Sequence, residues 1–125
     1  MQVEISDLQK GLIYRGRVSA IRQTYYVLEA SEYFFVLSFS RSKEAAGNFN
    51  VVDKKGVRYV QKAFAGQQGI TSNAIVTRAA RTKHAPTSLI ALNILYILVA
   101  TGAAQIEDRS DQRKLFFSIK RGSRH

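Results

Sequence analysis

The stretch TSLIALNILYILVATG, residues Thr87 to Gly102, decides how the rest of the chain must be arranged. Thr87 suits a helix N-cap because its hydroxyl can accept a hydrogen bond from an amide two or three residues later. Gly102 suits the left-handed position that ends many helices. Between them stands no charged side chain and only one strongly polar one, Asn93. We therefore expect a helix across these residues.

This predicted helix is apolar on two opposite sides. Helix residues follow one another at about 100° around the axis. One broad face then carries Leu89, Leu92, Leu95, Tyr96 and Val99. The opposite stripe carries Ile90, Ile94 and Ile97. We expect both sides to be buried, with the helix as the axis of the core. A membrane span needs about 20 apolar residues, and this stretch is shorter and interrupted by Thr, Ser and Asn, so we expect no membrane association.

The composition fits one small domain of 125 residues, which is long enough to bury a core without cross-links. The chain contains no cysteine, which excludes disulfides, thiolate chemistry and cysteine-type zinc sites. The N-terminus MQVEISDLQK lacks the apolar segment of a signal peptide, so we expect a cytoplasmic protein.

The formal net charge is +10, and it is unevenly distributed. No acidic residue occurs between Lys54 and Ile106, a span whose cations are Lys54, Lys55, Arg58, Lys62, Arg78, Arg81 and Lys83. Such one-sided charge attracts polyanions and favours a nucleic-acid partner. The alternative is a solvated basic surface that serves only solubility.

The N-terminal half has the pattern of a β-meander. Runs rich in β-branched and aromatic residues at 12–21, 24–30 and 33–40 are separated by two-residue connections, and a fourth short strand is expected at 49–52. Gly16 suggests a bulge in the first run. The alternation there would place Ile13, Arg15 and Arg17 on one side, and Tyr14 and Val18 on the other.

The C-terminal half has helical patterns and a final hairpin. Asp53 is expected to cap a helix that runs to Gly66, and Thr71 or Ser72 a second helix before the central one. Residues 104–108 and 114–120 should form two strands joined by a polar loop. The predicted fold class is α+β, with an N-terminal antiparallel β-meander (residues 1–50) packed on a three-helix unit with a C-terminal β-hairpin (51–121). Residues 122–125 look like a cloning linker running into a histidine tag.

The predicted order is three helices followed by a hairpin, with ITSNAIVTRAAR leading into TSLIALNILYILVATGAAQI. Over about residues 53–120 this order resembles the winged helix-turn-helix DNA-binding superfamily. The resemblance implies a double-stranded DNA-binding protein or domain, whose third helix enters the major groove while the hairpin wing touches phosphates or the minor groove. The chain departs from that pattern, because no Arg or Lys lies between Thr87 and Ala104. Either only the first turn of the third helix reaches DNA, or this helix packs on the β region or on a second copy.

The expected contacts lie on the second helix and its turn, on the third helix, and on the hairpin. Arg78 and Arg81 would hold phosphates, which positions the protein without reading sequence, and Asn93 could read adenine. The full set of expected nucleic-acid-binding residues is Arg78, Arg81, Lys83, His84, Thr87, Ser88, Asn93, Arg109, Arg113 and Lys114. We expect no catalytic residue, no metal, no cofactor and no small-molecule ligand, since the chain lacks the hydrolase, P-loop and zinc-protease motifs.

Two alternatives remain open from sequence. The chain could be a homodimeric assembly module, with the two-faced helix buried between copies and the basic surface incidental. It could instead bind single-stranded nucleic acid or RNA through the N-terminal sheet, where basic and aromatic side chains are interleaved. The residues of that sheet surface would be Arg15, Arg17 and Arg22 with Tyr14, Tyr25 and Tyr26.

Overall fold

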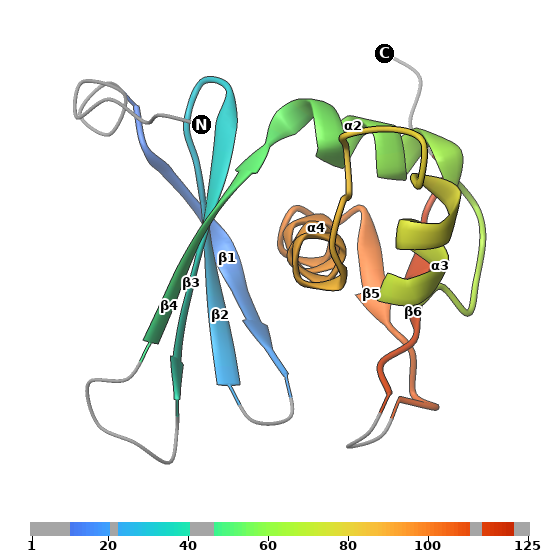
Figure 1. Cartoon of the computed structure of the whole chain (residues 1–125). Coiled ribbons are helices and arrows are strands. Elements are labelled where there is room, and N and C mark those ends of the chain that lie inside the picture. The colour runs from blue at the N-terminus through green and yellow to red at the C-terminus, as the bar shows by residue number, and fades with distance from the viewer. Residues whose placement is uncertain (1–10, 21–22, 41–46, 111–113, 122–125) are drawn as a thin grey trace.

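A computed structural model of the chain describes residues 11–20, 23–40, 47–110 and 114–121. It has an α+β fold with a four-stranded antiparallel sheet, three helices and a separate two-stranded hairpin (Figure 1). The elements are β1 (Ile13–Ser19), β2 (Gln23–Glu29), β3 (Tyr33–Ser40), β4 (Gly47–Asp53), α2 (Lys54–Ala63), α3 (Ser72–Arg78), α4 (Ser88–Ala100), β5 (Ala104–Ile106) and β6 (Phe117–Ile119). Arg22, Arg113 and the suspected tag at 122–125 lie outside the described residues.

The four-stranded sheet is a meander in the order β1-β2-β3-β4, as the sequence predicted. A register shift between Tyr14 and Gly16 confirms the expected bulge. The bulge changes the predicted faces of β1, because Tyr14 pairs with Leu28 while Gly16 and Val18 pair with Val27 and Tyr25. An extra residue inverts the alternation, so Tyr14 and Val18 lie on opposite faces of the sheet.

Helix α4 begins and ends as its sequence signals predict. The hydroxyl of Thr87 accepts a hydrogen bond from the amide of Ile90 at 3.2 Å. At the other end Gly102 has φ +83°, and the amides of Gly102 and Ala103 donate to the carbonyls of Val99 and Leu98. This pair of hydrogen bonds is the Schellman motif, which satisfies carbonyls that the helix leaves free.

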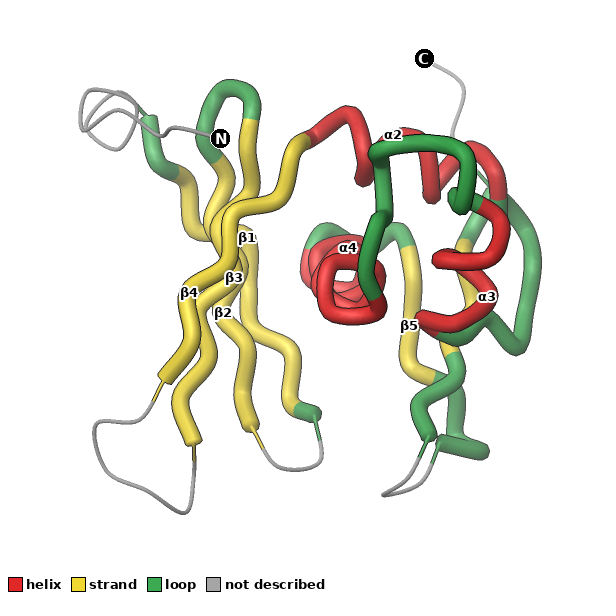
Figure 2. The backbone as a smooth tube through the Cα atoms, in the orientation of Figure 1, coloured by secondary structure: helices red, strands yellow, loops and turns green. Residues whose placement is uncertain are grey.

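Both sides of α4 are covered, which confirms the predicted two-sided burial except at Leu89, which is 58% exposed in the first turn of the helix. Figures 1 and 2 show α4 end-on between the four-stranded sheet and a layer formed by α3 and the hairpin, with α2 above. Ile94, Leu95 and Ile97 are 0% exposed. On the sheet side the ring of Tyr96 stacks on Tyr25 at 4.1 Å, and burial, together with this neighbour, raises the pKa of Tyr96 well above its ordinary value.

The β and helical halves share one hydrophobic core. Asp53 is the last residue of β4 and also the N-cap of α2, where its carboxylate accepts from the amide of Lys55 at 2.8 Å. The boundary predicted near residue 50 therefore falls within β4. Core residues such as Val27 and Val36 from the sheet belong to the same buried cluster as Val60. None of the helices in the described part of the chain has the length and apolar character needed to cross a bilayer.

Candidate nucleic-acid interface

Three segments meet around the ring of Tyr59 on α2. The ring stacks on the imidazole of His84, from the turn between α3 and α4, with centroids 4.8 Å apart and planes 19° from parallel. The Tyr59 hydroxyl also donates to the carbonyl oxygen of Arg78, the last residue of α3, at 3.4 Å. Tyr59 thus connects α2 to the end of α3 and to the turn that follows it.

Gly56 allows α2 to approach this turn closely. A Cβ atom at position 56 would stand 2.7 Å from the carbonyl oxygen of His84, closer than real side chains come to backbone. A glycine within a helix is unfavourable by about 0.5–1 kcal/mol relative to alanine, and the close approach gives the physical reason for one here. The relative position of α2 and the turn is therefore fixed by backbone contact.

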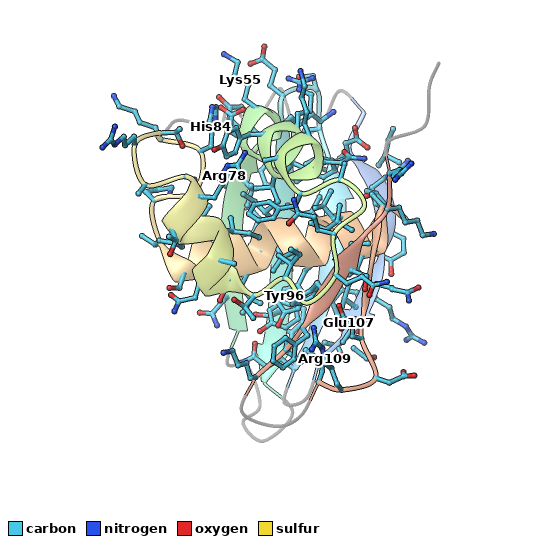
Figure 3. The ribbon with its side chains drawn as sticks, turned by 90° about the vertical axis from the view of Figure 1, so that its right-hand side faces the viewer. Lys55, Arg78, His84, Tyr96, Glu107 and Arg109 are labelled. Carbon is cyan, nitrogen blue, oxygen red and sulfur yellow. The ribbon has the colours of Figure 1, made fainter. Side chains whose placement is uncertain are left out.

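Five basic residues on these three segments form what we call the basic cluster; three further cations of α2, Lys54, Arg58 and Lys62, are not counted in it. Its members are Lys55, Arg78, Arg81, Lys83 and His84. The first four side chains are exposed, and none of them makes an ion pair with a described residue, whereas the neighbouring Lys54 is paired with Glu29 at 2.5 Å. Figure 3 shows Lys55, His84 and Arg78 close together at one end of the molecule. The cluster is therefore a surface of uncompensated positive charge.

The start of α4 continues this surface, but the rest of the helix does not. Thr87 and Ser88 are exposed and follow the turn directly. Asn93 is 1% exposed, and its side-chain amide donates to the carbonyl of Leu89 at 2.9 Å. A base in a DNA groove cannot reach Asn93 in this arrangement, so the expected contact with adenine has no support here.

The hairpin cations lie elsewhere and are engaged within the hairpin. Arg109 donates to the carboxylate of Glu107 at 2.7 Å, and its guanidinium lies 4.4 Å from the centre of the Phe116 ring. The ammonium of Lys114 lies 5.6 Å from the same ring. Figure 3 places Arg109 and Glu107 at the end opposite His84. The structure therefore divides the predicted nucleic-acid-binding residues into two groups. One is the basic cluster together with the start of α4, and the other is Arg109 and Lys114 on the hairpin.

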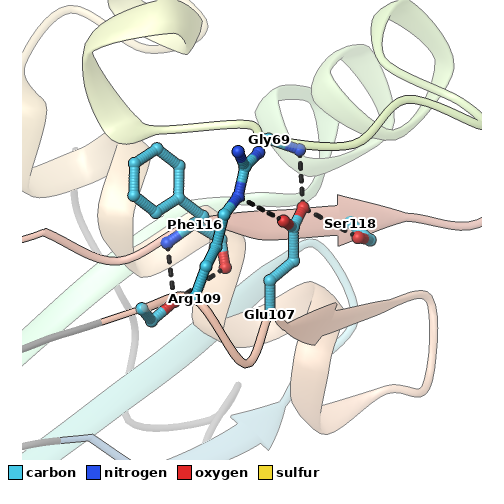
Figure 4. Close-up of polar contacts among 6 residues, drawn as sticks. Gly69, Glu107, Arg109, Phe116 and Ser118 are labelled. Atoms are coloured by element: carbon cyan, nitrogen blue, oxygen red, sulfur yellow. Dashed lines mark hydrogen bonds and ion pairs between the residues drawn. The ribbon is translucent and has the colours of Figure 1, made fainter.

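Glu107 connects the hairpin to the loop between α2 and α3. Its carboxylate accepts hydrogen bonds from the amide of Gly69 at 2.5 Å, from the Ser118 hydroxyl at 2.9 Å and from Arg109 (Figure 4). These donors, the Gly69 amide above all, lower the pKa of Glu107 from its ordinary 4.5, while partial burial opposes the shift. The carboxylate therefore stays ionised at neutral pH and ties Arg109 to a structural role.

Comparison of the chain with protein-family models, with curated proteins and with solved structures found no match.

A polar cleft of about 360 Å³ lies between the sheet, α2 and the end of α4. Its central carboxylate belongs to Glu29, which pairs with Lys54 and with Arg15 at 3.5 Å, and the ammonium of Lys54 also lies 5.4 Å from the Phe34 ring. Because Glu29 of β2 pairs with Lys54 of α2, we assign the group to docking of α2 on the sheet. Among the described residues, no three His, Asp or Glu side chains gather so that they could hold a metal ion.

Sequence reasoning did not include Lys55 and Tyr59 in the candidate site. Lys55 was visible only as one of seven unopposed cations, and the apolar pattern of α2 gave no sign that Tyr59 would contact His84. The contact joins residues 25 positions apart in the chain, and such a distance leaves no periodic signal in the sequence.

Proposed function

We propose that this chain is a cytoplasmic double-stranded DNA-binding protein or DNA-binding domain, and that the basic cluster is its contact surface. The observation that carries the proposal is that three segments carrying four exposed cations meet at the Tyr59–His84 stack, and that these cations are unpaired with any described carboxylate. Unopposed cations on a rigid surface neutralise phosphates and release counterions, which supplies most of the affinity for duplex DNA. The turn is rigid because Gly56 and Tyr59 fix it on α2.

The proposed unit is winged-helix-like, with one change in the use of its third helix. In the superfamily that the sequence resembles, this helix is laid into the major groove. Here its buried part supports the core, and only its first turn, with Thr87 and Ser88, lies beside the cluster. Phosphate contacts carry no direct sequence information, so we expect binding with weak sequence preference.

The homodimer alternative receives less support. It was motivated by the second apolar side of α4, which would need a partner if left open. Ile94 and Ile97 are 0% exposed within one chain, and the side chain of Ile94 lies beside Gly56 of α2. A second copy is therefore not required to cover α4.

The proposal is tested by titrating a labelled random-sequence duplex of 20 base pairs and following its fluorescence anisotropy at several salt concentrations. Four neutralised phosphates predict a slope of log K against log salt of about −3.6, so affinity should fall about 150-fold between 50 and 200 mM salt. A slope near zero, or no binding at low salt, would refute the proposal.

Two matched variants locate the surface. Arg78→Ala removes one cation of the cluster and should make the slope shallower by about 0.9 on each of two unrelated duplexes. Lys120→Ala removes the same charge from an exposed residue just after β6, outside the cluster, and should leave the slope unchanged. Equal effects of the two variants would mean that net charge, not the cluster, determines binding.

A further inference from the structure

The outer face of the four-stranded sheet is the face turned away from α4. No helix or strand of the described residues covers it (Figures 1 and 2). Strand register places on it three cross-strand rows, which are Tyr14, Leu28, Phe35 and Val51; Arg17, Tyr26, Leu37 and Phe49; and Ser19, Thr24, Phe39 and Gly47. These three rows contain one cation, Arg17, and no carboxylate. The same face also carries the pair Tyr33 and Asp53 where β4 leads into α2, so the carboxylate on this face lies at its α2 end.

This face differs from the aromatic and basic surface that the sequence suggested. Tyr25 lies on the opposite face, where it stacks on Tyr96, and Arg15 pairs there with Glu29. Phe39 and Phe49, which the sequence reading did not include, lie on the outer face instead. Side-chain alternation and the bulge in β1 account for the exchange.

The exposed large hydrophobic residues of these three rows are all aromatic, whereas the aliphatic residues of the rows are less exposed. Tyr14, Phe39 and Phe49 are 56%, 54% and 57% exposed. The aliphatic residues Leu28, Leu37 and Val51 are only half-exposed or less. A surface for a generic apolar partner would expose aliphatic groups as well, so the pattern favours a ligand that stacks on rings.

The rings are arranged as separate platforms. Phe49 stacks on the buried ring of Phe35, with centroids 5.5 Å apart and planes 11° from parallel, so its far side faces solvent. Phe39 contacts Tyr26 edge-on, with centroids 6.1 Å apart. Since Phe39 and Phe49 are diagonal neighbours on adjacent strands, about 7–8 Å separates their backbones. Two bases could each occupy one ring.

We propose that the outer face binds single-stranded DNA, with bases stacked on Phe39 and Phe49 and a phosphate held by Arg17. Nucleobases stack on exposed aromatic rings, and the formal net charge of +10 of the whole chain attracts an anionic strand. A second copy of the chain is a poorer occupant, because each copy carries a formal charge of +10 and would bring its own Arg17 to the contact. The choice of DNA over RNA rests on the proposed function.

The test uses the full chain and a labelled 15-nucleotide oligo-dT, which cannot form a duplex with itself, with anisotropy as the readout. Phe49→Leu keeps an apolar side chain but removes the ring, whereas Phe49→Tyr keeps the ring. We expect Phe49→Leu to bind oligo-dT at least about 5-fold more weakly, the lower end of base–ring stacking effects. Phe49→Tyr should bind like the parent chain. Leu89→Ala, which truncates a 58% exposed side chain on α4, is the control for loss of exposed apolar surface and should also bind normally.

Thermal melting of each variant verifies that it is folded, and Phe39→Leu repeats the test at the second ring. The proposal is overturned if Phe49→Leu and Phe39→Leu both bind like the parent chain, or if Phe49→Tyr is as weak as Phe49→Leu. It is also overturned if sedimentation shows a dimer that Phe49→Leu dissociates, since a second copy then occupies the face. Tighter binding of oligo-U than of oligo-dT would overturn the choice of DNA. Duplex titration of the parent chain and of Arg78→Ala separates the two proposals. If duplex DNA does not bind, but oligo-dT still binds and depends on Phe49, only the proposal for the basic cluster is refuted.

Discussion

Truncation of Ile94 tests whether α4 is a buried core helix or a solvent-exposed recognition helix. The side chain is 0% exposed, and its terminal methyl group would lie 3.6 Å from a Cβ atom at Gly56. Large-to-small substitutions of buried aliphatic residues destabilise by about 2–5 kcal/mol, and more where the site cannot collapse. The contact of Gly56 with the His84 carbonyl holds α2 in place, so we expect Ile94→Ala to fall in the upper part of that range, about 3–5 kcal/mol.

At about 4 °C per kcal/mol for a chain of this size, Ile94→Ala should lower the Tm by about 12–20 °C. Leu89→Ala removes the same number of side-chain atoms from the same helix at a position that is 58% exposed, and should change stability by less than about 0.5 kcal/mol. Circular dichroism melts and urea titrations of both variants measure the difference.

Ile94→Asp is a more severe version of the same test. It would place an unpaired carboxylate in the core, at a cost of several kcal/mol, which is comparable to the total stability of a small domain. We expect it to leave the chain unfolded or insoluble. An Ile94→Asp protein that is soluble, melts with the parent chain and loses only DNA binding would show that α4 is a surface helix, and the packing argument would be refuted.

Three further predictions concern the helix ends and the Glu107 contacts. Thr87→Ala removes the N-cap of α4 and should cost about 1 kcal/mol, while Ser88→Ala, in the first turn, should be near neutral in the same urea titration. Gly102→Ala meets no neighbouring atom but forces a side chain to φ +83°, so it should cost about 1 kcal/mol by thermal melting. Glu107→Gln should destabilise the chain at neutral pH. Because folding lowers the pKa of Glu107, its stabilisation is complete above the ordinary value of 4.5 and is lost as pH falls through the lowered value, so the two proteins should converge in acid. A stability difference that is independent of pH would contradict this.

Local signals in the sequence were sufficient to predict the elements and their order. Asp53, Thr71 and Thr87 each cap the helix that follows them, and the run at 33–40 is β3 as predicted. The hairpin strands are shorter than the patterns at 104–108 and 114–120 suggested. Beyond Ile106 the carboxylate of Glu107 is bound to Gly69, and the hydroxyl of Ser110 exchanges hydrogen bonds with Phe116, in place of a regular ladder.

The candidate site was only partly predictable. The charge pattern of the span 54–106 identified Arg78, Arg81 and Lys83, because the absence of carboxylates is visible in any linear reading. It could not show that Lys54 is paired with Glu29 or that Asn93 is buried, since both facts depend on which elements pack together.

The sequence by itself determined the order of the helices and strands, where the three helices begin, that α4 is apolar on both sides, and that the charge is uneven. Each of these depends on residues within a few positions of one another. It did not determine every end, because the helix expected to run to Gly66 stops at Ala63. Only the tertiary structure decided which elements cover α4, which side of the bulged β1 faces outward, and which cations share a surface. Those outcomes depend on contacts between residues far apart in the chain, such as Tyr59 with His84 and Gly69 with Glu107. The same sequence pattern would allow several packings of these elements, and such contacts select one of them.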